Sequence, residues 1–167
     1  MNKVGFIGTG LMGFPMAKNL LKSGIKLKAY NRSIKKAEPL KKFDAEISST
    51  LANVVKNNNF IITMLSDDKA VESIMGQSDF LENLNPGSTV IDMSSVKPTT
   101  AIKYEKILKS KNINYLDAPV SGGTVGAEQA SLAIMVGGQQ SVFDNSESIL
   151  KMMGNPTLVG PSGSGQV

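Results

Sequence analysis

Three stretches of this sequence combine glycine with small polar residues in patterns that can hold an anionic ligand. Gly8-Thr9-Gly10-Leu11-Met12-Gly13 has the spacing G-x-G-x-x-G, which brings backbone N–H groups to the phosphates of a dinucleotide. Asn31-Arg32-Ser33 follows at about the 20-residue distance at which such folds contact the adenosine ribose. Ser121-Gly122-Gly123 offers further N–H groups and a hydroxyl, which can hold a carboxylate or simply form a flexible connector.

The glycines of the first stretch have separate structural roles. Gly8 allows a tight turn, Gly10 lets the backbone approach a pyrophosphate, and Gly13 lets a helix pack closely on a strand. The apolar run 4–7 before them predicts a strand, and apolar residues at helical spacing after them predict a helix. A bare glycine pattern is common by chance, so these flanking elements are what favour dinucleotide binding over a turn that binds nothing.

The residues after the second predicted strand bear on the choice of cofactor. Asn31 stands where an NAD-preferring site usually has a carboxylate, and Arg32 and Ser33 could hold a 2′-phosphate. We therefore expect NADP, with NAD as the alternative. Arg32 could instead be an exposed loop residue, and Ser33 could be the N-cap of the next helix.

Two further strands end in residues that could line the cofactor. The apolar run 60–65 is typical of a strand buried on both sides, and 89–93 is another strand. Because the carboxyl ends of parallel strands border the ligand crevice, we expect cofactor contacts there. The candidates are Met64, Leu65, Ser66, Ser94 and Ser95.

Strand and helix patterns alternate along the chain. This alternation predicts an α/β fold: a Rossmann-like, doubly wound, mostly parallel sheet with helices on both faces. The segment 120–126 is expected to be a small-residue loop. Further strands are expected at 25–30, 114–116, 131–136 and 156–159, and helices at 34–43, 49–56, 69–75, 98–111 and 139–153.

The composition narrows the chemistry. The 167 residues carry a formal charge of +4 and contain no cysteine and no histidine. Disulfides and cysteine or histidine catalysis are therefore excluded, and no metal site is predicted. The scattered lysines are typical of solvated helix faces, so we expect neither nucleic acid nor membrane as a partner. The first strand begins close to Met1, from which we expect a cytoplasmic protein.

One series of stretches is much more specific than the glycine pattern alone. It comprises residues 4–13 with 16–20, 31–33, 62–65, 91–95, 117–123 and 132–138. The series resembles the β-hydroxyacid dehydrogenase family, which is related to the NAD(P)-binding domain of 6-phosphogluconate dehydrogenase. The resemblance implies reversible NAD(P)-dependent oxidation of a small β-hydroxy acid or reduction of a semialdehyde. It also implies that Leu65, Ser66 and Ser95 lie along the cofactor, Ser95 near the nicotinamide, and that Ser121, Gly122 and Gly123 bind the substrate carboxylate.

The sequence departs from the family pattern in a few places. Ser66 replaces a usual proline, and Ala130-Ser131 replaces a Gly-Thr pair, which weakens only the prediction of the substrate. The family's acid–base lysine is the last residue of a G-x-G-x-x-x-K stretch that begins here at Gly163, so it is expected just after Val167 and no catalytic residue is assigned here.

The same pattern suggests how the domains are organised. We expect residues 1–162 to form the cofactor domain and 163–167 to begin the linker to a helical domain through which the parent homo-oligomerises. The alternatives are a stand-alone, non-catalytic dinucleotide-binding module and an imine reductase of the same architecture.

Overall fold

Successive side chains of a β-strand point to opposite faces of the sheet. In the central strands both sets of side chains are buried, each in its own hydrophobic cluster. The computed structural model describes residues 2–167. In β1 (Lys3–Ile7), Phe6 packs into one hydrophobic cluster and Ile7 into the other. Ile62 and Ile61 divide in the same way in β4 (Phe60–Thr63). The sheet therefore separates two hydrophobic cores.

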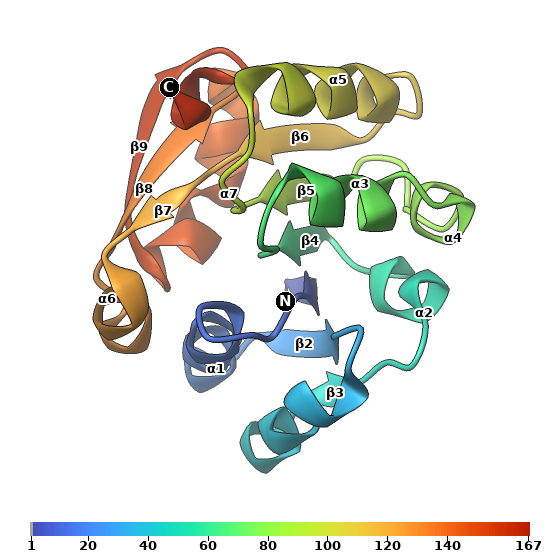
Figure 1. Cartoon of the computed structure of the whole chain (residues 1–167), viewed down its shortest axis with the longest axis vertical. Coiled ribbons are helices and arrows are strands. Elements are labelled where there is room, and N and C mark those ends of the chain that lie inside the picture. The colour runs from blue at the N-terminus through green and yellow to red at the C-terminus, as the bar shows by residue number, and fades with distance from the viewer. Residues whose placement is uncertain (1) are drawn as a thin grey trace.

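The described residues form a nine-stranded, mostly parallel sheet, as the sequence predicts (Figure 1). The strand order is β3-β2-β1-β4-β5-β6-β8-β7, and β9 pairs with β8. The strands from β3 to β6 are parallel, whereas β8 runs antiparallel to β6 and β7. The other strands are β2 (Lys26–Tyr30), β3 (Glu46–Ile47), β5 (Thr89–Asp92), β6 (Asn114–Asp117), β7 (Val120–Ser121), β8 (Leu132–Gly137) and β9 (Gly154–Gly160).

Helices cover both faces of the sheet (Figure 1). Buried residues of α1, α6 and α7 belong to the cluster that contains Phe6, and those of α2, α3, α4 and α5 to the cluster that contains Ile7. The doubly wound arrangement is thus confirmed. The helices are α1 (Gly13–Lys22), α2 (Leu51–Val55), α3 (Asp68–Met75), α4 (Ser78–Leu81), α5 (Pro98–Lys109), α6 (Gly123–Gln129) and α7 (Gln140–Lys151).

Two local predictions need correction. The expected helix over 34–43 is two 3₁₀ helices, η1 (Ile34–Lys36) and η2 (Glu38–Phe43), because a proline ring is tolerated only in a first turn and Pro39 opens η2. The expected loop 120–126 instead contains β7 and the start of α6. Short elements β3 and α4 were not predicted.

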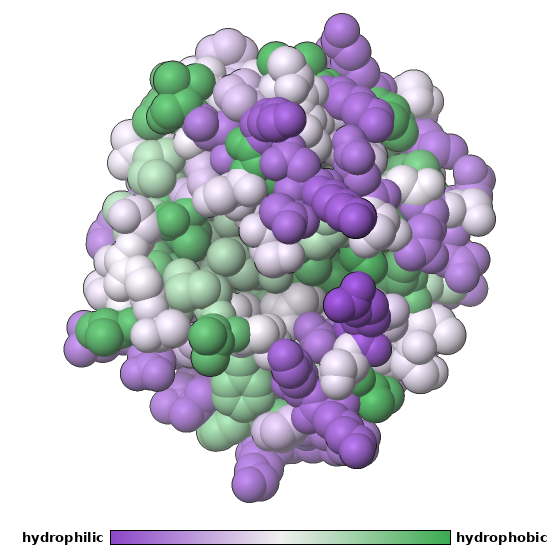
Figure 2. Space-filling view, in the orientation of Figure 1, coloured by the Kyte–Doolittle hydropathy of each residue, from purple (hydrophilic) through white to green (hydrophobic). Residues whose placement is uncertain are grey.

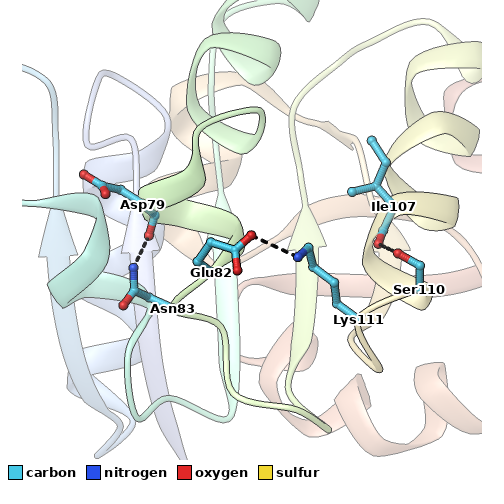
Figure 3. Close-up of polar contacts among 6 residues, drawn as sticks. All are labelled: Asp79, Glu82, Asn83, Ile107, Ser110 and Lys111. Atoms are coloured by element: carbon cyan, nitrogen blue, oxygen red, sulfur yellow. Dashed lines mark hydrogen bonds and ion pairs between the residues drawn. The ribbon is translucent and has the colours of Figure 1, made fainter.

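An exposed ion pair joins residues just after α4 and α5, and Figure 3 shows it with the local polar contacts on either side. Lys111 Nζ lies 3.1 Å from Glu82 Oε1, and Asn83 Nδ2 donates to the Asp79 carbonyl at 2.8 Å. Exposed pairs of this kind contribute little because water competes for both charges. The fold therefore depends on its two cores. Every helix within residues 2–167 is too short or too polar to cross a lipid bilayer.

Truncating a core side chain should cost far more stability than removing a surface charge. Leu20 in α1 has no exposed surface, so Leu20→Ala should lower the free energy of unfolding by about 3 kcal/mol through lost burial and a cavity. Lys111→Ala should change it by less than about 0.5 kcal/mol. Urea titrations followed by circular dichroism measure the free energy of unfolding of both variants. Equal losses would contradict the claim that the fold depends on its cores.

Candidate functional site

The glycine-rich turn brings the end of β1, the start of α1 and the end of β4 into contact. Gly8 has a φ of +101°, and a Cβ there would lie 2.2 Å from the Met64 carbonyl oxygen. A Cβ on Gly13 would lie 1.7 Å from the Gly8 carbonyl oxygen. A Cβ on Gly10, in contrast, would meet nothing within 4 Å. Gly8 and Gly13 are therefore required by packing, while Gly10 leaves the outer surface of the turn open.

The start of α1 presents unpaired backbone donors at this turn. Within residues 2–167, the N–H groups of Leu11 and Met12 donate to no protein acceptor, and the first turn of α1 contains no acidic residue. The Thr9 side chain is almost completely buried, yet its Oγ1 has no hydrogen-bond partner in the described structure. These groups can hold an anion, because the helix dipole adds positive charge to the free donors.

A groove of about 580 Å³ begins at this turn and continues along α1. Thr9, Gly10 and Leu11 line one end of it, and Leu11 is 85% exposed. Basic side chains line its length, which favours a negatively charged occupant. Figure 2, in the orientation of Figure 1, shows paler, less polar residues between more hydrophilic surfaces over the middle of the molecule. The basic residues of the groove are Lys18, Lys22 and Lys36.

Asn31 braces the glycine turn. Its Oδ1 accepts from the Thr9 N–H at 2.9 Å, and its Nδ2 donates to the Ser33 carbonyl at 2.9 Å. Arg32 and Ser33 are both exposed beside it. Ser33 occupies the N-cap position of η1 but makes no side-chain capping bond. Arg32 and Ser33 are thus free to meet a ligand, while the Asn31 side chain is already engaged.

The turns after β4 and β5 are joined by a buried polar network. Ser94 Oγ accepts from the Leu65 N–H at 2.8 Å, and Asp92 Oδ1 accepts from Thr63 Oγ1 at 2.9 Å. Burial raises the pKa of Asp92 to about 6, although hydrogen bonds from Ser94 and Thr63 act in the opposite direction. Ser94 is fully buried and Ser95 is exposed, so Ser95 is the serine of the pair that faces outward. Of the other candidates on these turns, Met64 and Leu65 are half-buried and Ser66 is exposed.

The serine–glycine turn opens a helix that packs against α1. Gly122 and Gly123 have φ angles of +139° and +62°, and Ser121 is exposed next to them. The helix that begins at Gly123, α6, packs against α1, where Asn19 Nδ2 donates to the Ala127 carbonyl at 2.7 Å (Figure 1). The structure therefore brings together two stretches that lie more than 100 residues apart in the sequence.

The last residues pack onto the carboxyl ends of β5 and β6. Asp117 is fully buried, and its oxygens accept from the N–H groups of Gly163 at 2.7 Å and Gly165 at 3.0 Å. Burial raises the pKa of the Asp117 carboxyl, while these N–H groups lower it. The short 3₁₀ helix η3 (Ser164–Gln166) follows. Sequence reasoning assigned no role to Asp117 or Gln166, although a buried aspartate at a strand end signals a backbone donor nearby.

Comparison with known proteins agrees with this arrangement. Residues 3–160 match the model of the NAD binding domain of 6-phosphogluconate dehydrogenase. The chain belongs to this family. It is a nicotinamide-dinucleotide-binding domain of Rossmann type, as the fold and the glycine turn predicted.

Three similar proteins give the match more detail. The chain is 37% identical over 166 residues to 2-hydroxy-3-oxopropionate reductase of Escherichia coli, covering 98% of this chain and 56% of the relative. A structure of 3-hydroxyisobutyrate dehydrogenase of Mycobacterium tuberculosis with L-serine has a TM-score of 0.95 and 30% identity, covering 99% and 57%. A structure named Psf3, in complex with NADP⁺ and 2-OPP, has a TM-score of 0.93 and 28% identity, covering 98% and 58%. The chain spans a little over half the length of each.

The residues present fit a dinucleotide. The unpaired N–H groups of Leu11 and Met12 and the orphaned Thr9 hydroxyl can bind a diphosphate, and the open space at Gly10 leaves room for it. Residues 2–167 hold no cluster of three or more acidic side chains that could bind a metal ion. The groups at the glycine turn thus match the phosphates of a dinucleotide.

Asp92 should make stability fall as the pH rises from about 4 to about 6. Its pKa is about 6 in the folded chain against an ordinary value of 3.8, so in this range the folded state retains a proton that the unfolded state has lost. Asp92→Asn removes this dependence and keeps an acceptor for Thr63 and Ser94. The stability of the variant relative to the unchanged chain should rise by about 2 kcal/mol between pH 4 and pH 7. Urea unfolding at both pH values tests this, and a constant difference would contradict the raised pKa.

Proposed function

We propose that this chain is the NADP(H)-binding domain of an oxidoreductase that acts on a small β-hydroxy acid or semialdehyde. One observation carries the proposal: the turn with free N–H groups opens α1, the serine–glycine turn opens α6, and these two helices pack against each other. We therefore propose that a phosphate site at the first turn and a carboxylate site at the second border one cleft. The two relatives named above as a reductase and a dehydrogenase of small hydroxy or oxo compounds support this substrate class.

Each predicted site residue has a role in this proposal. The glycine turn binds the diphosphate, and the turns after β4 and β5 support the nicotinamide half. Ser121, Gly122 and Gly123 bind the substrate carboxylate. The cofactor supplies or accepts the hydride, and the cleft orients the substrate carbon toward it. The proposed cofactor contacts are Gly8, Thr9, Gly10, Leu11, Met12, Gly13, Asn31, Arg32, Ser33, Met64, Leu65, Ser66 and Ser95. Ser94, which was also expected to contact the cofactor, is fully buried and instead holds the Leu65 turn.

The proton that accompanies hydride transfer needs a separate donor or acceptor. We propose that it is a lysine just after Val167, in a part of the whole protein beyond residues 163–167. This assignment rests on the family resemblance, as do a cytoplasmic location and a homo-oligomer formed through a helical domain. Assays of the whole protein with β-hydroxy acids and semialdehydes, and with both cofactors, test the activity. Turnover of none of them would contradict it.

The preference for NADP rests on Arg32 and Ser33. The Asn31 oxygen already accepts from Thr9, and a neutral amide oxygen is a weaker acceptor for a ribose hydroxyl than the carboxylate of an NAD site. The exposed guanidinium of Arg32 and hydroxyl of Ser33 remain to pair with a 2′-phosphate. The relative bound to NADP⁺ is consistent with this choice.

Gly10→Ala should block the cofactor without unfolding the chain. The added methyl group meets no protein atom within 4 Å, but it would occupy the open surface of the turn where we place the diphosphate. We expect an increase of at least about tenfold in the Kd for NADPH, measured by NADPH fluorescence, with an unchanged Tm. Gly13→Ala is the contrast, because its methyl group would collide with the Gly8 carbonyl and lower the Tm. Unchanged NADPH binding by Gly10→Ala would contradict the proposed site.

Arg32→Ala should weaken NADPH selectively. Loss of a charge-assisted pair with the 2′-phosphate should raise the Kd for NADPH by about tenfold or more and leave the Kd for NADH within about twofold. Lys35→Ala, which removes an exposed positive charge nearby, is the matched control. Calorimetric titration of both cofactors measures the ratio. An equal loss for NADPH and NADH would contradict recognition of the 2′-phosphate by Arg32.

A further inference from the structure

The Gln166 side chain makes hydrogen bonds to the backbone on both sides of Ser95. Its Oε1 accepts from the Val96 N–H at 3.1 Å, and its Nε2 donates to the Ser94 carbonyl at 3.0 Å. Both backbone groups belong to the turn after β5, beyond the last residue that pairs within the sheet. One side chain therefore fixes the peptide groups on either side of an exposed serine.

Gln166 is itself held in place by the backbone before it. Asp117 accepts from the N–H groups of both Gly163 and Gly165, so this turn is fastened at two points to the end of β6. Gly165 is buried, and a Cβ there would lie 2.4 Å from the Met135 carbonyl oxygen. The turn has little freedom to move, and Gln166 projects from a fixed support.

The other side of the Ser94–Val96 turn is equally constrained. Ser94 Oγ accepts from the Leu65 N–H, and the Ser94 N–H donates to Asp92 Oδ1 at 3.1 Å. A continuous set of hydrogen bonds thus runs from β6 through the terminal turn to the turns after β5 and β4. These two turns are remote in sequence from the glycine turn and from Asn31.

We propose that Gln166 is a positioning residue for the nicotinamide half of the cofactor and that Asp117 supports it. This inference rests on the proposed function, which places Ser95 beside the nicotinamide. Gln166 holds Ser95 and, through Ser94, the Leu65 turn in the conformation that binds that half. The adenosine half lies at the glycine turn and at residues 31–33, which Gln166 does not contact.

The two halves can be separated by the choice of ligand. NADPH contains both halves, whereas 2′,5′-ADP contains only the adenosine half with its 2′-phosphate. For Gln166→Ala in the 167-residue chain, we expect the Kd for NADPH to rise about tenfold, since two hydrogen bonds to the turn are lost. The Kd for 2′,5′-ADP should remain unchanged. Gln140→Ala removes an exposed glutamine side chain in α7 and should alter neither.

The outcomes distinguish this inference from the function on which it rests. Unchanged NADPH binding by Gln166→Ala would overturn the positioning role while leaving the cofactor site intact. Equal weakening of both ligands would also overturn it, because a general structural loss would not select the nicotinamide half. Binding of neither ligand by the unchanged chain would overturn the proposed function and this inference with it. A raised Kd for NADPH but not for 2′,5′-ADP, in a Gln166→Ala chain whose Tm matches that of Gln140→Ala, would support the positioning role.

Discussion

The contact between the first turn of α1 and the end of β1 is the constraint on which the rest of the site depends. Gly13 lies directly against the Gly8 carbonyl, and Gly8 lies against the Met64 carbonyl, with no side chain between them. Backbone from β1, α1 and β4 therefore meets at one point. Helix α1 begins at the carboxyl edge of the parallel strands, and the unpaired N–H groups before its first turn face outward there.

Much of this arrangement could be predicted because it is encoded locally. Successive strand residues face opposite cores, as Phe6 and Ile7 do, and a run that is apolar at every position identifies a strand covered on both faces. The glycine spacing is also partly local, since Gly13 packs on the Gly8 carbonyl five residues before it, whereas the contact of Gly8 with Met64 is distant in sequence. The strand and helix order then follows from alternation along the chain.

Other features were not predictable, because they depend on contacts between distant residues. The pairing of Thr9 with Asn31 and of Val96 with Gln166 leaves no pattern in either stretch alone. The antiparallel direction of β8 is also hidden, since an apolar strand has the same composition in either direction. The segment 120–126 resembles a loop because its small residues carry little helical periodicity, yet packing of α6 on α1 makes part of it a helix.

The brace formed by Asn31 limits how this fold can change its coenzyme preference. A carboxylate at position 31 could still accept from Thr9, but its second oxygen would face the Ser33 carbonyl, to which the amide now donates. Exchange of one coenzyme for the other by substitution at that position would therefore loosen the turn where we propose that the diphosphate binds. The side chains of the two neighbouring exposed residues can be replaced without breaking a hydrogen bond of this scaffold.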